Sequence, residues 1–206
     1  MLVGRDTEQR AIQSLLDRAR GGESGVLALV GEAGIGKSTL LEWAAGRAGG
    51  MAVLRARGVQ SEAHIPFAGL FELLRPALGS LDQLPEPQAA ALEGALALRP
   101  AATRDRLAVG AATLTLLAAY AERAPVAVLI DDAHWLDGST ADALRFALRR
   151  LLADPVAVVL TVREGEPSLL DGTDLPLLTL GGLDAEATAA LLRERAPAVD
   201  ARRLHD

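Results

Sequence analysis

A glycine-rich stretch, GEAGIGKS at Gly31–Ser38, has the residue types and spacing best suited to phosphate chemistry in this sequence. It fits the pattern GxxxxGK[ST] and lies between an apolar run at 26–30 and a helix-like segment that starts near Lys37. Glycines let backbone N–H groups turn inward, and the following helix presents its positive end there. This context predicts a P-loop. Its phosphate-contacting residues would be Gly31, Glu32, Ala33, Gly34, Ile35, Gly36, Lys37, Ser38 and Thr39.

Two side chains of this stretch would carry most of its chemistry. Lys37 would reach the β- and γ-phosphates, and the Ser38 hydroxyl would complete a Mg²⁺ shell made of phosphate oxygens and water. Lys37 is the only lysine in a chain with 21 Lys and Arg residues, which suggests that a compact ammonium is needed there. The alternative is a chance glycine-rich turn, since a dinucleotide fingerprint read from Gly34 and Gly36 fails because it would need glycine in place of Thr39.

A pair of carboxylates, Asp131 and Asp132, ends a second apolar run at 126–130. This run has no polar alternation, which is typical of a strand buried on both faces of a parallel sheet. Ligands of such sheets bind at the carboxyl ends of the strands, where the P-loop also lies. We therefore expect Asp131 to hold Mg²⁺ and Asp132 to be the general base that orients the attacking water. The alternative is a turn or helix-capping pair.

Arg163 follows another apolar strand, predicted at 156–160, and would lie beside the phosphates. An arginine in this position can sense the γ-phosphate and offset charge in the transition state, although a surface salt bridge is the alternative. Arg145, Arg149 and Arg150 could reach the site of a neighbouring molecule, but a solvated helix face is the preferred interpretation.

The elements that position these residues are predicted from hydrophobic periodicity and from glycine and proline breaks. Strands are expected at 26–30, 51–56, 126–130, 156–160 and 175–180. Helices are expected at about 7–20, 37–48, 66–78, 88–98, 104–123, 139–152 and 183–195. Thr7 is a predicted N-cap, His64 a solvated loop residue, and the predicted core includes Trp43, Phe67, Leu70, Phe71 and Leu74.

Composition limits the class of protein. Half of the 206 residues are hydrophobic, and a net charge of −6 gives no overall electrostatic attraction for nucleic acid. The absence of cysteine excludes disulfides, thiolate metal sites and cysteine nucleophiles within this chain. No uncharged apolar run reaches the ~20 residues that span a bilayer, and Met1 leads into polar sequence rather than a signal peptide. We therefore expect a cytoplasmic protein with no membrane partner.

With both nucleotide motifs in place, the sequence resembles the ATPase module of the large ATP-binding LuxR-type transcriptional regulators, within the STAND class of AAA-like signalling NTPases. The matching segments are LVGRD at 2–6, GEAGIGKST at 31–39, PFAGLFELLRPAL at 66–78, DDAHWLD at 131–137 and TVRE at 161–164. Together they span nearly the whole chain, and PFAGLFELLRPAL and DDAHWLD are far more specific than the generic GKS.

The resemblance implies an α/β fold, a P-loop NTPase with a five-stranded parallel sheet between helices in three layers. The strands that end at Asp131 and Thr161 would be neighbours near the P-loop strand. The NTPase domain would cover 1–180 with a helical insertion at about 61–123, and 181–206 would begin a truncated helical lid.

Family motifs also imply further site residues. Val3, Gly4 and Arg5 match the motif that lies against adenine and ribose, and Thr161 and Arg163 match the sensor position. The C-terminal helix-turn-helix domain of the family is absent, so we expect a fragment whose parent contacts DNA only through that domain.

Taken together, the motifs and the resemblance favour a signalling switch that binds ATP or ADP with Mg²⁺ and hydrolyses ATP slowly, in a parent regulator that can form homo-oligomers. One alternative is a regulatory module that binds ADP or ATP without hydrolysis. A small-molecule kinase is less favoured, since a P-loop alone is shared by many activities. GTP is disfavoured because guanine-reading motifs use a lysine, and the only lysine is already in the P-loop.

Overall fold

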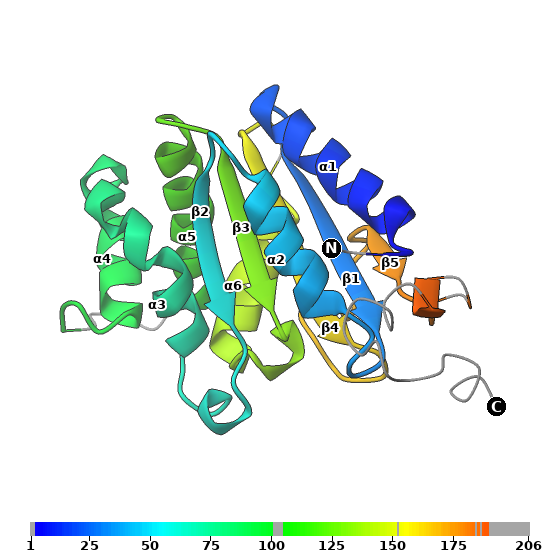
Figure 1. Ribbon diagram of the computed structural model, residues 1–206. Helices are drawn as coiled ribbons and strands as arrows, with labels where there is room; N and C mark the ends of the chain where they lie inside the picture. Colours follow the sequence, from blue (N-terminus) through cyan, green and yellow to red (C-terminus); the bar gives the residue numbers. More distant parts are fainter. Residues whose placement is uncertain (1–2, 101–104, 152, 184, 186, 190–206) are drawn as a thin grey trace.

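The computed structural model of this chain describes residues 3–100, 105–151, 153–183, 185 and 187–189. Its central element is a sheet of five parallel strands in the order β2-β3-β4-β1-β5 (Figure 1). The strands are β1 (Gly25–Gly31), β2 (Ala52–Arg57), β3 (Val126–Asp131), β4 (Val156–Arg163) and β5 (Leu177–Thr179). The α-helices are α1 (Asp6–Arg20), α2 (Lys37–Arg47), α3 (Ala68–Leu74), α4 (Glu86–Ala95), α5 (Arg106–Ala121) and α6 (Gly138–Leu148). The predicted α/β fold is confirmed.

The strand order explains which motifs meet. β3 pairs with β4 and β4 pairs with β1, all in parallel, so their carboxyl ends lie at one edge of the sheet. Gly31 of β1 is level with Arg163 of β4, and Asp131 of β3 is level with Arg57 of β2. The P-loop and the paired carboxylates therefore emerge at the same edge, which is the lower one in Figure 1.

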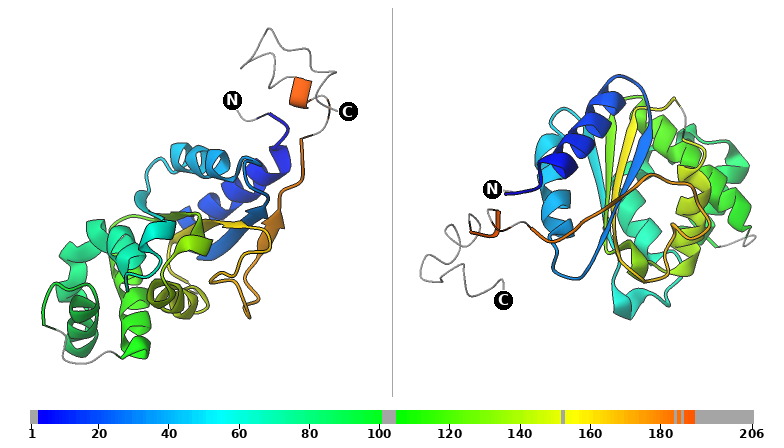
Figure 2. Two further views of the ribbon diagram at one scale, coloured as in Figure 1. Left: turned by 90° about the horizontal axis from the view of Figure 1, so that it is seen from below. Right: turned by 90° about the vertical axis from the view of Figure 1, so that its right-hand side faces the viewer.

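Helices cover both faces of the sheet, which gives the three layers seen edge-on in the right view of Figure 2. On one face, α1 and α2 bury Ile12, Leu16 and Leu40 against the sheet. On the other face, α3, α4, α5 and α6 form a larger core that includes Leu70, Leu92, Leu116, Leu117 and Leu144. Successive strand residues point to opposite faces, and both faces are covered by helices. β3 and β4 are therefore buried nearly throughout, as their unbroken apolar sequences predict. Each buried leucine contributes about 1.5–3 kcal/mol.

The segment after β2 differs from the single helix predicted at 66–78. The α-helix there covers only Ala68–Leu74, and 3₁₀ turns continue to Gln83. Phe67 has a left-handed φ of 63°, which sets the start of the helix, and Pro76 has no N–H to continue α-helical hydrogen bonding.

Core predictions in this segment are partly wrong for the same reason. Phe71 is 39% exposed, because the short helix turns this side chain away from the face that packs on the sheet. Leu70 and Leu74 are buried as predicted, and Phe67 is half-buried against the core.

Three local predictions have mixed outcomes. Thr7 is not an N-cap, since α1 already begins at Asp6 and places Thr7 in its first turn. Trp43 is only half-buried at the edge of the core, where the Arg47 guanidinium lies 5.1 Å from its ring. His64 is exposed, as predicted.

Most of the helix predicted at 183–195 lies outside the described residues. Within this range, the described residues 185 and 187–189 are helical. Within the part of the chain that the structure describes, no helix combines the length and apolarity needed to cross a bilayer.

Candidate nucleotide-binding site

The P-loop connects the end of β1 to the start of α2. Gly34 and Gly36 have φ values of 78° and 103°, conformations that side-chain-bearing residues rarely adopt. Gly36 is the N-cap of α2, so the positive end of this helix opens onto the loop. The local sequence thus forms a loop whose backbone is suited to anions.

Lys37 is buried beneath this loop, with 7% of its surface exposed. Its Nζ donates to the carbonyl oxygens of Gly31 and Glu32, each at 2.7 Å. Burial lowers the pKa of Lys37, the carboxylates of Asp132 and Asp131 oppose this shift, and Arg163 adds to it. The ammonium therefore lies within the field of both predicted carboxylates, in a place where phosphate would offset its loss of water.

The Ser38 hydroxyl and the Asp131 carboxylate lie close enough to bind the same metal ion. The Ser38 hydroxyl donates to Asp131 Oδ1 at 3.0 Å, and the Thr161 hydroxyl donates to the same oxygen at 2.7 Å. A hydroxyl and a carboxylate are hard oxygen ligands, which suit Mg²⁺. No group of three or more His, Cys, Asp or Glu side chains among the described residues could hold a metal. Mg²⁺ here would therefore draw most of its ligands from phosphate and water.

Asp132 has an unusual backbone conformation, with φ 49° and ψ 46°. A left-handed non-glycine residue costs about 1–3 kcal/mol, so the surrounding contacts must maintain it. The Asp132 N–H donates to the Thr161 hydroxyl at 2.8 Å, and its carbonyl accepts from the Trp135 N–H at 2.8 Å. Asp132 Oδ2 also lies 3.3 Å from Arg57 Nη2. The turn places Asp132 opposite the P-loop.

A cavity of about 380 Å³ separates two walls, which we call the loop wall and the strand-end wall. The loop wall consists of Ala33, Gly34, Gly36, Lys37, Ser38 and Thr39. The strand-end wall consists of Asp132, His134, Trp135 and Arg163. The volume is within the range of about 300–1,000 Å³ that is usual for small-molecule sites.

Thr161 lies behind the strand-end wall rather than on it. The residue is fully buried, and its hydroxyl joins Asp131 to Asp132. In this structure Thr161 therefore acts on a ligand only through the two aspartates that it positions.

Val3, Gly4 and Arg5 do not line this cavity. Arg5 is 5% exposed, and its guanidinium donates to the Ile35 carbonyl and to Glu8, both at 3.0 Å. A Cβ on Gly4 would collide with Ala187, so this segment packs closely against the start of the predicted lid. Arg5 supports the P-loop directly.

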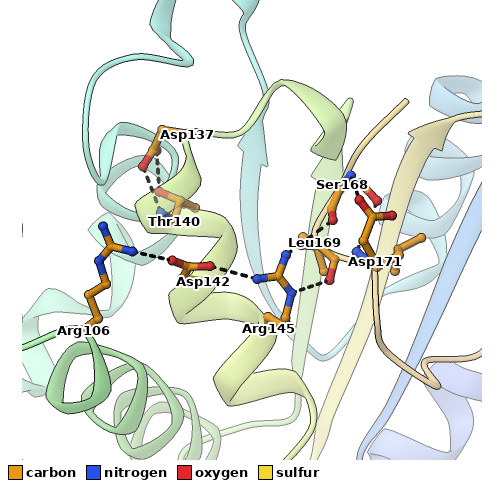
Figure 3. Close-up of polar contacts among 9 residues, drawn as sticks. Arg106, Asp137, Thr140, Asp142, Arg145, Ser168, Leu169 and Asp171 are labelled. Atoms are coloured by element: carbon orange, nitrogen blue, oxygen red, sulfur yellow. Dashed lines mark hydrogen bonds and ion pairs between the residues drawn. The ribbon is translucent and has the colours of Figure 1, made fainter. Parts of the chain in front are cut away.

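Asp137 was not among the predicted site residues, and it is 3% exposed. Its carboxylate accepts from the Thr140 N–H at 2.9 Å and hydroxyl at 2.6 Å (Figure 3), and from the N–H groups of Phe67 at 2.8 Å and Gly69 at 3.3 Å. Asp137 therefore caps α6 and also holds the start of α3. An aspartate before Gly-Ser-Thr is a local N-cap signal that could have identified the first role. His134 and Arg57 were also not predicted as site residues. The only sequence signal for His134 was its place in the motif DDAHWLD.

Arg145 is held within the molecule, so its interpretation as a solvated residue is wrong. It donates to Asp142 at 2.8 Å and to the Leu169 carbonyl at 3.2 Å, and Asp142 also binds Arg106 at 3.1 Å (Figure 3). These contacts join α6 to α5 and to the segment after β4. Arg149 and Arg150 are exposed, as predicted.

Solved structures share this arrangement of strands and helices. A Signal Transduction ATPase with Numerous Domains (STAND) protein with a tetratricopeptide repeat sensor, from Pyrococcus horikoshii, matches with a TM-score of 0.55 and 21% identity over 98% of this chain and 26% of that one. The E. coli HORMA:CdnC:Trip13 complex contains a chain that matches with a TM-score of 0.51 and 13% identity, over 97% of this chain and 70% of that one. At these identities the likeness shows the fold alone.

Sequence comparison identifies the family. An uncharacterised protein of Rhizobium meliloti (strain 1021) is 28% identical in an alignment of 230 residues that covers 95% of this chain and 22% of the relative. This chain thus spans less than a quarter of that relative's length. A family model described as an AAA ATPase domain matches residues 1–159. The chain therefore belongs to the AAA ATPase domain family.

Proposed function

We propose that this chain binds ATP with Mg²⁺ and hydrolyses it slowly to ADP and phosphate, as the nucleotide switch of a larger signalling regulator. One observation carries the proposal: Lys37 and Asp132 line opposite walls of one cavity, and Asp131 accepts a hydrogen bond from Ser38, the residue that follows Lys37. ATP hydrolysis requires a cation that binds phosphate, two oxygen ligands that hold a metal and a carboxylate that orients water. Membership of the AAA ATPase domain family supports the same conclusion.

Each residue has a distinct part in this proposal. Lys37 binds the phosphates, and Ser38 with Asp131 holds the metal. Asp132 orients water and accepts its proton, and Arg163 offsets negative charge from the same wall. When bound, Mg²⁺ supplies further neutralisation of phosphate charge.

Calorimetric titration of the chain with ATP, ADP and GTP, each with Mg²⁺, tests the binding part. We expect adenine nucleotides to bind and GTP to bind more weakly. A folded chain that binds none of the three would refute the proposal.

The regulatory part of the proposal depends on the parent protein. It is supported by the sequence resemblance to LuxR-type regulators and by the fold likeness to a STAND protein, of which this chain covers 26%. We propose that nucleotide state controls homo-oligomer formation of the parent and that DNA is contacted through another domain. Light scattering of the parent protein with ATP or ADP tests this, and equal masses in both states would contradict it.

A second function, regulatory binding of ADP or ATP without hydrolysis, is favoured by one specific contact. Arg57 Nη2 lies 3.3 Å from Asp132 Oδ2, so the proposed base is already paired with a cation. Phosphate release over hours distinguishes the two functions. Release that disappears in Asp132→Ala supports hydrolysis, whereas no release from either protein supports the binding module.

A further inference from the structure

His134 is a polar side chain of the cavity that has no part in the proposed mechanism so far. It lies in the 3₁₀ turn Ala133–Trp135, directly after Asp132, and borders the cavity from the strand-end wall. The loop wall with Lys37 faces it. A histidine in this place can contact whatever lies between the two walls.

The contacts of the ring determine which nitrogen carries the proton. His134 Nδ1 accepts a hydrogen bond from the Arg163 backbone N–H at 3.3 Å. A nitrogen that accepts has no proton, so in the neutral ring the proton is on Nε2. Nε2 has no hydrogen-bond partner among the described residues. The ring is further fixed by Trp135, whose ring centroid is 5.2 Å away. Nε2–H is therefore an unused donor in a ring of fixed orientation.

Burial of the ring favours its neutral form. Burial lowers the pKa of His134, and Lys37 and Arg163 act in the same direction, while Asp132 and Glu166 oppose it. A neutral imidazole still has one N–H, so it can bind an anion without taking up a proton.

We infer that the Nε2–H of His134 donates to the terminal phosphate of ATP and so lets the site distinguish ATP from ADP. This inference rests on the proposed function. The loop wall holds the inner phosphates through backbone N–H groups, whereas Asp132 must lie beyond the terminal phosphate to orient water. His134 shares the wall of Asp132, so the phosphate within its reach is the terminal one, which ADP lacks.

Two substitutions separate the donor from the rest of the side chain. The amide of His134→Gln can place an N–H near the position of Nε2, whereas His134→Asn is shorter and retains a polar group only near Nδ1. Calorimetry of the full chain with ADP and with a non-hydrolysable ATP analogue gives the affinity ratio. We expect His134→Asn to weaken binding of the analogue by about 10- to 100-fold, with ADP affinity unchanged within twofold. His134→Gln should retain more of the preference for the analogue over ADP.

Several results would overturn the inference. One is an unchanged ratio of ATP-analogue to ADP affinity in His134→Asn, and another is equal weakening of both nucleotides in this variant. A third is the same affinity ratio in His134→Gln and His134→Asn. His64→Asn is the matched control, because His64 is exposed and outside this cavity, and it should leave both affinities unchanged. If the unsubstituted chain binds neither nucleotide, the proposed function fails. If it binds both through Lys37 but the ratio does not depend on His134, only this inference fails.

Discussion

The two walls of the cavity are maintained in different ways. The loop wall is one continuous segment, and its shape comes from the positive φ values of Gly34 and Gly36 and from the helix that follows. The strand-end wall combines the turn after β3 with the end of β4, and it is supported from behind by Thr161, which joins Asp131 to Asp132. The first wall depends mainly on backbone conformation, and the second depends on tertiary packing.

The turn that carries the strand-end wall also contacts the segment after β2 and the start of α3. Gly58, which follows β2, donates its N–H to the Asp131 carbonyl at 2.8 Å, and a Cβ at this position would collide with the Asp132 carbonyl. Asp137 holds the start of α3 from the opposite end of the same turn. Substitutions behind this wall should therefore affect stability, whereas substitutions in the loop wall should affect binding.

Asp137→Ala should have the largest effect on the strand-end wall. It removes the acceptor of three backbone N–H groups and the Thr140 hydroxyl, so we expect the free energy of unfolding to fall by about 3–5 kcal/mol. Urea denaturation measures this change. Asp142→Ala is the control on the same helix, since the Asp142 side chain is 40% exposed and its ion pairs should contribute less than about 1 kcal/mol. Equal losses in the two variants would contradict the role of Asp137.

Lys37→Ala should have the largest effect on the loop wall. We expect affinity for ATP and ADP to fall by at least about 100-fold, or about 2.7 kcal/mol, while the chain remains folded. Calorimetry and circular dichroism give the two readouts. Lys37→Arg should also bind poorly, because a planar guanidinium cannot reproduce the compact ammonium that bonds Gly31 and Glu32. Retained affinity in Lys37→Ala would refute the assignment of the phosphate site.

Thr161→Val tests how the strand-end wall is held together. Valine has the same shape but leaves the Asp132 N–H and Asp131 Oδ1 without this partner, so we expect a loss of about 1–2 kcal/mol in unfolding free energy. Thr161→Ser keeps the hydroxyl and should lose less. If Thr161→Val leaves the free energy of unfolding unchanged, the hydroxyl contributes nothing measurable, and the proposed connection between the aspartates is wrong.

Arg57→Ala should have the smallest effect on stability. Arg57 is 67% exposed on its side chain, so loss of the ion pair should change the free energy of unfolding by less than about 0.5 kcal/mol. We expect phosphate release to rise, because Asp132 is then free to orient water. A lower rate in a phosphate-release assay would show instead that Arg57 helps to position the base.

Much of the fold and of the loop wall could be predicted from the sequence because the signals are local. β3 and β4 are uninterrupted apolar runs, and the P-loop is contiguous. The contact of Asp137 with the start of α3 could not be predicted, since its partner Phe67 is 70 residues away and takes a left-handed conformation that aromatic residues rarely adopt. The pairing of Arg57 with Asp132 was likewise hidden, because it depends on β2 lying beside β3.

Lys37, as the only lysine of the 206 residues, also makes this chain a simple target for amine chemistry. A lowered pKa leaves more of the amine unprotonated and nucleophilic, but its burial and its two carbonyl partners keep acylating reagents away. Apart from the chain's amino terminus, every acyl group that such a reagent attaches to an amine must therefore mark Lys37. The rate of labelling would measure how often its amine leaves the Gly31 and Glu32 carbonyl groups, and a ligand that covers Lys37 would slow it.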